Sequence, residues 1–119
     1  MIEILTIGLD DRVLGLRVRG SIEESDLDRV TAAFERKLEH HKPLRIYVEA
    51  QDLGMISPAA LVQDLRLALH HFRDVERGAV VSDADWLSLL SRAGDLLPGI
   101  DVRAYPQSEG SKAIEWING

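Results

Sequence analysis

Two segments in the C-terminal half of the chain repeat one layout, in which an apolar run is followed by a polar turn and a helical pattern with a tryptophan. Residues 78–81 lead through Ser-Asp into a segment with Trp86, and residues 100–105 lead through Pro-Gln-Ser into one with Trp116. Strands that alternate with helices are typical of α/β domains. The 119 residues give room for one substantial core, so we expect a single domain over residues 1–119.

Hydrophobic periodicity predicts the other elements of this domain. Residues 2–9 and 13–19 are expected to form an antiparallel hairpin with Asp10 and Asp11 in its turn. The expected later strands are residues 44–50, 78–82 and 100–105, and the expected helices follow Ser21 or Ser25, Ser57, Asp83 and Ser108. The fold class is therefore α/β, with a five-stranded mixed sheet that begins with the hairpin, continues in β-α units and carries four helices.

The predicted strands alternate between apolar and polar residues. In residues 44–50, Leu, Ile, Val and Ala occupy one side, whereas Arg45, Tyr47 and Glu49 occupy the other. Strands of a parallel sheet that is covered on both faces usually form continuous apolar runs instead. Right-handed crossovers would also place the helices together on one face. We therefore expect one face of the sheet to be free of helices, and to be either solvated or covered by a second subunit.

The polar strand positions are candidates for a contact between two copies of the chain. Arginine and tyrosine are favoured at protein interfaces, and mixed charges permit a two-fold contact. Leu67, opposite the apolar side of its predicted helix, is a further candidate. The candidates are Arg17, Arg19, Arg45, Tyr47, Leu67, Arg103 and Tyr105. The alternative is a sheet face whose charges serve solubility, and composition does not separate the two.

The composition argues against several classes of protein. The net charge of −6 disfavours nucleic-acid binding, which needs a basic surface to replace counterions. The absence of cysteine excludes disulfides and fits a reducing compartment. The first residues lack the order of a signal peptide, and no apolar stretch is long enough to span a bilayer. We expect a cytoplasmic protein that is not integral to a membrane.

Few residue groups support catalysis. The histidines are adjacent pairs, at 40–41 and 70–71, and neighbours on a helix point apart, so no metal site is expected. Asp83 and Asp85 are similar to the Asp-x-Asp of haloacid-dehalogenase-type phosphatases, but Trp86 stands where those motifs continue with Thr or Val. A helix cap with an acidic first turn explains both aspartates. The sequence predicts no enzyme and no cofactor.

An apolar pocket between helices and sheet is a second possibility. Its candidate lining residues are Met55, Ile56, Leu61, Trp86 and Leu90. Such a pocket would suit a small apolar ligand such as a lipid. The tryptophan and leucines also fit ordinary core positions of their helices, so this alternative stays open.

The order of elements and several short motifs resemble the SpoIIAA-like proteins of the STAS superfamily. The motifs are Gly20, Ile22 and Asp26 at a helix start, residues 78–86 with Trp86, and Ala113 with Trp116 and Ile117. This resemblance covers nearly the whole chain. It implies a mixed sheet with helices, homo-oligomers, and binding or regulation in place of catalysis. Some relatives are described as similar to CRAL-TRIO lipid-binding domains.

The resemblance also implies a candidate phosphorylation site. Anti-sigma-factor antagonists carry a phosphorylated serine at the start of the helix after the third strand, and Ser57 occupies that place. Ile56 and Pro58 differ from the Asp and Ser of the family motif, and its glycine is missing. As a helix N-cap before an N1 proline, Ser57 is also fully explained by local structure.

These observations favour a non-catalytic regulatory or protein-interaction module of STAS-like type that acts as a homo-oligomer. Its expected contact surface is the loop and helix of residues 51–67 together with the polar sheet face. A carrier or sensor of a small apolar ligand is the alternative.

Overall fold

The computed structural model describes residues 1–53, 56–68, 72–83 and 99–119. In these residues the chain forms five strands and three α-helices, with short 3₁₀ turns at Phe72–Asp74 and Gln107–Glu109. The strands are β1 (Ile2–Leu5), β2 (Val13–Arg19), β3 (Leu44–Gln51), β4 (Val75–Ser82) and β5 (Asp101–Pro106), and the helices are α1 (Glu24–Leu38), α2 (Pro58–Ala68) and α4 (Gly110–Asn118). The helix expected after Asp83 lies outside the described residues.

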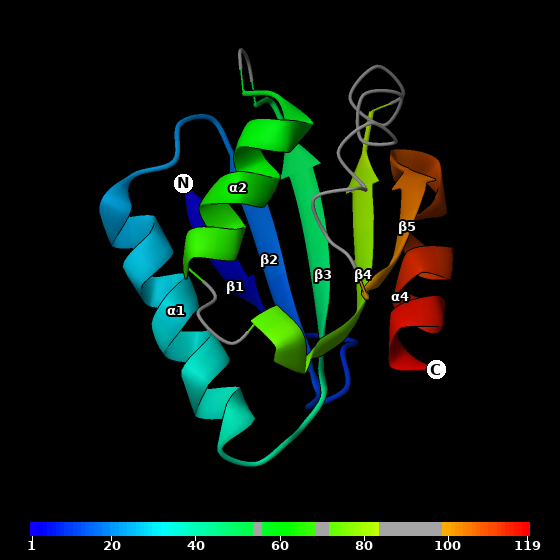
Figure 1. Ribbon diagram of the computed structural model, residues 1–119. Coiled ribbons are helices and arrows are strands. Elements are labelled where there is room, and N and C mark those ends of the chain that lie inside the picture. The colour runs from blue at the N-terminus through cyan, green and yellow to red at the C-terminus, as the bar shows by residue number, and fades with distance from the viewer. Residues whose placement is uncertain (54–55, 69–71, 84–98) are drawn as a thin grey trace.

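The strands form one sheet in the order β1-β2-β3-β4-β5 (Figure 1). β1 and β2 pair antiparallel, and β2 to β5 are parallel. The structure therefore confirms the α/β class and the mixed five-stranded sheet that opens with a hairpin. Helix α1 connects the parallel neighbours β2 and β3, and α2 connects β3 and β4, as in β-α-β units.

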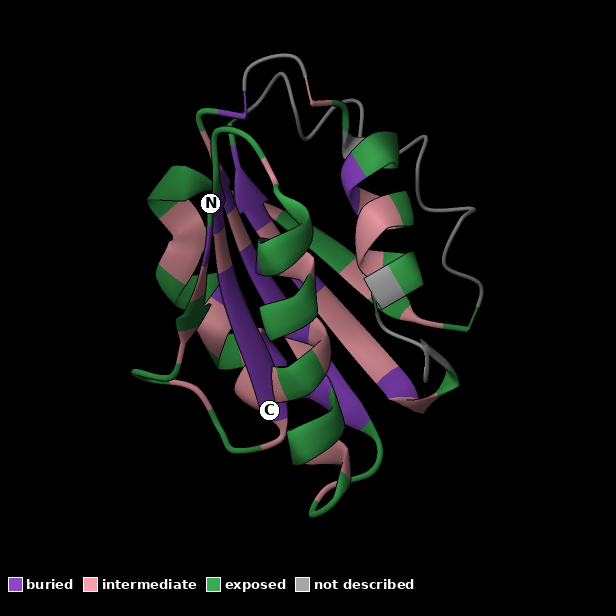
Figure 2. Cartoon of the chain, turned by 90° about the vertical axis from the view of Figure 1, so that its left-hand side faces the viewer, coloured by how far each residue is buried: buried purple, intermediate pink, exposed green. Residues whose placement is uncertain are grey.

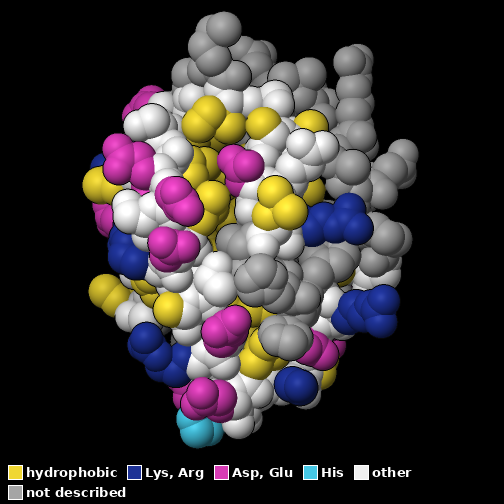
Figure 3. All heavy atoms as spheres, turned by 60° about the vertical axis from the view of Figure 1, so that its left-hand side comes forward, with side chains coloured by type: hydrophobic (Ala, Val, Ile, Leu, Met, Phe, Trp, Pro, Cys, Tyr) yellow, Lys and Arg dark blue, Asp and Glu magenta, His cyan; other side chains and the backbone are white. Residues whose placement is uncertain are grey.

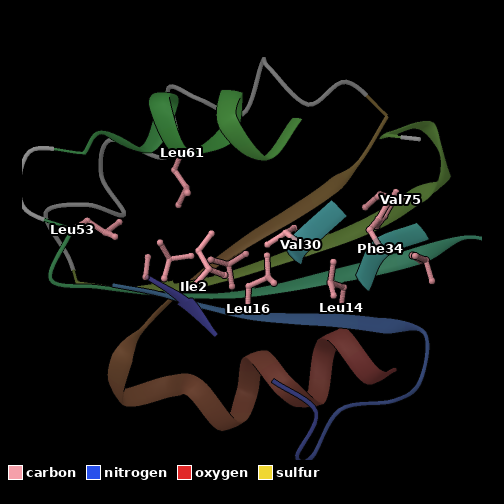
Figure 4. Close-up of a cluster of buried hydrophobic side chains, with 12 residues drawn as sticks. Ile2, Leu14, Leu16, Val30, Phe34, Leu53, Leu61 and Val75 are labelled. Carbon is pink, nitrogen blue, oxygen red and sulfur yellow. The ribbon is translucent and has the colours of Figure 1, made fainter. Parts of the chain in front are cut away.

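The larger core lies between one face of the sheet and the helices α1 and α2. Val30 and Phe34 of α1 and Leu61 of α2 pack there against apolar strand residues such as Leu14 and Leu16 (Figure 4). These strand residues belong to the apolar set that alternation predicts. Each of the five side chains is at most 2% exposed, so the two helices bury this part of the sheet face.

The second face of the sheet is covered as well, and the expectation of a face free of helices is wrong. Helix α4 lies across β3, β4 and β5 on the side opposite α1 and α2 (Figures 1 and 4). Its residues Ala113 and Ile117 form a second core cluster with Val13, Tyr47 and Ala79. Figure 2 shows the resulting layers, with buried strands between helices whose outer sides are exposed.

Arginine side chains of β3, of β4 and of the residue before β2 hold α4 in place. The last carbonyl groups of a helix have no partner inside the helix and need donors from elsewhere. Arg45 Nη1 donates to the Ile117 carbonyl at 2.8 Å, Arg77 Nη1 to the Trp116 carbonyl at 3.3 Å, and Arg12 Nη2 to the Asn118 carbonyl at 3.2 Å. Arginine charge is also favoured at the negative end of a helix dipole. The polar side of the alternation therefore docks a helix of the same chain.

The loop between β1 and β2 closes another part of this face. A Cβ atom on Gly15 would lie 2.3 Å from Leu9 Cδ1 and 2.7 Å from the Leu5 carbonyl oxygen. Glycine thus lets the loop fold onto the sheet. The Asn118 side chain ties α4 to the same loop, accepting from Asp10 N and donating to Gly8 O.

The N-terminus of α1 differs from the sequence expectation, in which Ser21 or Ser25 was the cap. The helix begins at Glu24, and the Asp26 carboxylate accepts a hydrogen bond from the Glu23 backbone at 3.0 Å. Aspartate at the third helical position satisfies a free N–H as a capping serine would. The predicted start of α2 at Pro58, after Ser57, is confirmed. Among the described residues, no helix combines the length and apolarity that a bilayer crossing requires.

Candidate functional site

A pocket of about 520 Å³ lies where β2 and β3 end, beside the start of α1 and the helix α2. Its lining residues are Gly20, Ser21, Ile22, Asp52, Leu53, Ile56 and Asp64. Ligands of α/β proteins commonly bind beyond the carboxyl ends of the strands, where loops supply varied side chains. This position makes the pocket the candidate binding site among the described residues.

Two left-handed residues shape the loops around the pocket. Gly20 has φ +57° and follows β2, and Asp52 has φ +49° and follows β3. The Gly20 backbone N–H donates to the Asp52 carbonyl at 3.2 Å, which joins the two strand ends. A positive φ in a residue other than glycine is uncommon, although aspartate and asparagine tolerate it better than most. Asp52 therefore lines the pocket from a left-handed turn that is hydrogen-bonded to the end of β2.

The pocket combines an apolar floor with carboxylates. Ile22, Leu53 and Ile56 supply the apolar surface, and Leu53 is 7% exposed and part of the main core. Neither carboxylate of the rim, at Asp52 or at Asp64, forms an ion pair or side-chain hydrogen bond within the described part of the chain. The site therefore offers negative charge beside apolar surface, and no described cation neutralises it.

Asp26 fixes the start of α1, which follows the lining residues Gly20 to Ile22. Its carboxylate accepts from the Glu23 and Ile2 backbones and from Arg29 Nη2 at 2.6 Å, and its side chain is 9% exposed. Arg29 Nη2 also donates to the Ile2 carbonyl at 2.7 Å. The hydrogen bond from Glu23, followed by those from Ile2 and Arg29, lowers the pKa of Asp26. The aspartate thus anchors the start of α1 to strand β1.

Ser57, the candidate phosphorylation site, caps α2. Its Oγ accepts a hydrogen bond from the Ala60 backbone N–H at 3.1 Å, and the residue is exposed. The capping geometry explains why serine precedes Pro58 here. A phosphate on Ser57 would stand at the N-terminus of α2, where free N–H groups favour negative charge.

Arg45 and Tyr47, two of the interface candidates, are buried. Arg45 is 5% exposed, and its Nε donates to Glu76 at 2.7 Å. Tyr47 is 2% exposed and lies in the cluster beneath α4. The expectation that these two side chains lie on an open face is wrong, because α4 occupies that part of the sheet.

Tyr47, Glu49 and Arg17 form a hydrogen-bonded row across the same face. Tyr47 Oη donates to Glu49 Oε1 at 2.8 Å, and Arg17 Nε donates to Glu49 Oε2 at 2.9 Å. Burial, and then the contact with Glu49, raises the pKa of Tyr47, so the phenol stays protonated. Arg17 also lies 3.5 Å from Glu3. These partners hold Arg17 within the chain's own network.

The other interface candidates keep more exposure. Leu67 is 74% exposed, Arg19 and Arg103 are exposed, and Tyr105 is half-buried against the second cluster. Arg103 stacks on the Trp116 ring, with 4.6 Å from its guanidinium carbon to the ring centroid. Trp116 is therefore partly exposed between α4 and the strand edge, and is not a core residue like Ala113.

The sequence-based pocket overlaps the observed one at a single described residue. Ile56 lines the pocket, whereas Leu61 is 2% exposed within the main core. Met55, Trp86 and Leu90 lie outside the described residues. Sequence reasoning missed Asp52 and Asp64; the position of Asp52 directly after a strand end was the available signal.

No group of three or more His, Asp or Glu side chains that could hold a metal ion occurs among the residues whose structure is described.

Comparison with known proteins identifies one family. The model of the SpoIIAA-like family matches residues 13–118, which is nearly the entire chain. No curated protein and no solved structure matches the chain.

Proposed function

Because the chain belongs to the SpoIIAA-like family, we propose that it works by binding, as a non-catalytic regulatory or protein-interaction module of STAS type. The observation that carries this proposal is the pocket at the carboxyl ends of β2 and β3. It joins apolar surface to unpaired carboxylates, which is the composition of a recognition site more than of a reaction centre.

The binding function can be tested by co-purification from the host under native conditions. Wild-type chain is compared with a variant in which Ile56 is replaced by Lys, which fills the pocket floor with charge. The proposal predicts a stoichiometric protein partner that wild-type chain retains and Ile56→Lys loses. A matched control is Ile7→Lys, since Ile7 is 94% exposed and distant in sequence from the pocket. Turnover of a substrate by the chain alone would contradict a non-catalytic role.

Self-association is a finer part of the proposal. The end of the sheet face beyond α4 carries both signs of charge, in the half-buried pair Glu3 and Arg17 and the exposed Arg19, and this mixture would suit a two-fold contact. Sedimentation equilibrium should then give a dimer that Arg19→Glu converts to a monomer. If the wild-type chain is a monomer even at high concentration, the proposed self-association is refuted and the proposed binding function is unaffected.

Phosphorylation of Ser57 is also kept as a proposal, supported by its exposed position at the N-terminus of α2. Mass spectrometry of protein taken from stressed and starved cells should find the phosphoserine. Its persistent absence in both states would refute a phosphorylation switch.

Transport of a small apolar ligand is the second candidate function. Ile22, Leu53 and Ile56 favour it, because they give the pocket an apolar floor. Native mass spectrometry of the purified chain should then reveal a co-purifying lipid, and ligand-free protein would argue against it.

A further inference from the structure

We propose that the pocket and the adjoining groove between α1 and α2 bind a basic segment of a partner protein, with a lysine or arginine side chain seated between Asp52 and Asp64. This inference rests on the proposed binding function and specifies the partner's chemistry. The aliphatic stem of such a side chain would lie on the apolar floor while its charged end meets the rim carboxylates.

Helix α1 contributes an acidic border to the groove. Glu24, Asp28 and Glu35 fall four and seven residues apart, so they share one stripe of the helix. Asp26 and Arg29 both contact Ile2 of β1, so the flank of α1 that carries them faces β1. The acidic stripe therefore faces away from β1, towards α2 and solvent. All three side chains are exposed, and none forms an ion pair among the described residues.

Helix α2 supplies the other border. Asp64 lines the pocket, and Leu67, 74% exposed, lies one turn further along the same flank. Figure 3 shows a strip of apolar side chains on this side of the molecule, with acidic side chains beside it. An exposed leucine next to the pocket gives the partner an apolar contact in addition to the charged one.

Charge complementarity selects the occupant. Helix α1 carries three basic side chains. Arg29 pairs with Asp26, Lys37 donates to the Asp11 carbonyl, and Arg36 falls seven residues after Arg29, on the flank turned away from the acidic stripe. A second copy of this chain, with net charge −6, would be repelled by the same carboxylates. A small molecule would be poorly enclosed, because ligand sites usually bury most of their ligand and this pocket opens to the surface. A basic protein segment would supply the missing positive charge, and neither the repulsion of a second copy nor the open shape of the pocket argues against it.

The test uses the full chain and a phage library of random dodecapeptides. Enriched peptides should carry lysine or arginine beside a large apolar residue. Synthetic copies are then titrated against wild type, Asp52→Asn, Asp64→Asn and the double variant by fluorescence anisotropy. Asparagine keeps the left-handed backbone at position 52 and removes only the charge.

The double variant should bind roughly tenfold more weakly and each single variant about threefold, as expected for partly exposed ion pairs. Affinity for wild type should also fall as salt is raised. Glu115→Gln is the matched control: it removes the same charge from an exposed position on α4, and its affinity should equal that of wild type. Thermal melts of all variants establish that each is folded.

Neutral or acidic peptides, or basic peptides that bind the double variant with wild-type affinity, would overturn the inference. If the host partner binds the double variant as tightly as wild type, the proposed binding function is retained, but the assignment of its site to Asp52 and Asp64 is refuted. If neither peptides nor a host partner bind at all, the proposed function falls with it. A change of sedimentation in Asp64→Asn would mean that a second copy occupies the groove, and would also overturn the inference.

Discussion

The single side chain of Asp26 caps the start of α1 and also binds the backbone of strand β1. Its carboxylate accepts from the backbones of Glu23 and Ile2, and so bridges the first turn of α1 and the edge strand β1. The Gly20-x-Ile22-x-x-x-Asp26 motif was visible in the sequence, but the contact with β1 was not. Side-chain bonds to distant backbone depend on how elements pack, which local periodicity does not encode.

Replacing Asp26 by Asn should lower the free energy of unfolding by about 1–3 kcal/mol near neutral pH, because backbone donors lose a charged acceptor. The folded-state pKa of Asp26 is lowered, so the stability that it contributes is present above the unfolded pKa of about 3.9 and is lost as pH falls through the folded value. Urea unfolding across this range should therefore show wild type and Asp26→Asn converging in acid. A gap that stays constant with pH would contradict the assignment.

Gly15 offers a steric test of how the β1–β2 loop packs on the sheet. Gly15→Ala should destabilise the fold by roughly 1–3 kcal/mol, because the new methyl group meets Leu9 and the Leu5 backbone. Gly78→Ala is the control within β4: its Cβ would have Val102 Cγ2 at 3.8 Å as nearest neighbour, so stability should be unchanged or slightly higher. Equal urea midpoints for the two variants would show that the loop does not rest on Gly15.

At the scale of elements, alternation in the strands was the strongest guide and also the source of the main error. It identified the apolar face that α1 and α2 cover, with Leu14 and Leu16 in the core. It also marked Arg45 and Tyr47 as polar, and polar residues were equated with an open face. In the structure the arginine binds a helix end and the tyrosine hydroxyl binds Glu49, so both are buried with partners. Hydropathy measures the cost of burying a polar side chain. It does not include the hydrogen-bond partner that offsets this cost in the folded protein.

The docking of α4 can be tested at Arg45. Arg45→Met should cost about 1–3 kcal/mol in unfolding free energy, since the Ile117 carbonyl loses its donor in a buried setting. Arg19→Met, an exposed arginine on the neighbouring strand, should change stability by less than about 0.5 kcal/mol. Chemical denaturation separates the two variants. A null effect at both positions would mean that α4 does not depend on this hydrogen bond.

At the scale of the whole molecule, helices lie on both faces of the sheet, α1 and α2 on one and α4 across β3, β4 and β5 on the other. The candidate pocket lies at the end of the sheet where β2 and β3 meet the loops, and our proposal places binding there. From the sequence, the helix start after Ser57 was predicted correctly, and Ile56, a candidate lining residue, borders the observed pocket. The sequence did not predict that Asp52 and Asp64, twelve residues apart, border one pocket, because that proximity follows from the placement of α2 over the strand ends.

The occupation of the second sheet face by the chain's own helix is the claim on which the remaining account depends. Nuclear Overhauser effects between the Tyr47 ring and the methyl groups of Ala113 and Ile117 test it most directly. The account predicts these contacts in dilute protein, with intensities that do not change on further dilution. Their absence, or their loss on dilution, would show that α4 does not cover the face and that the surface expected for a second subunit is open after all.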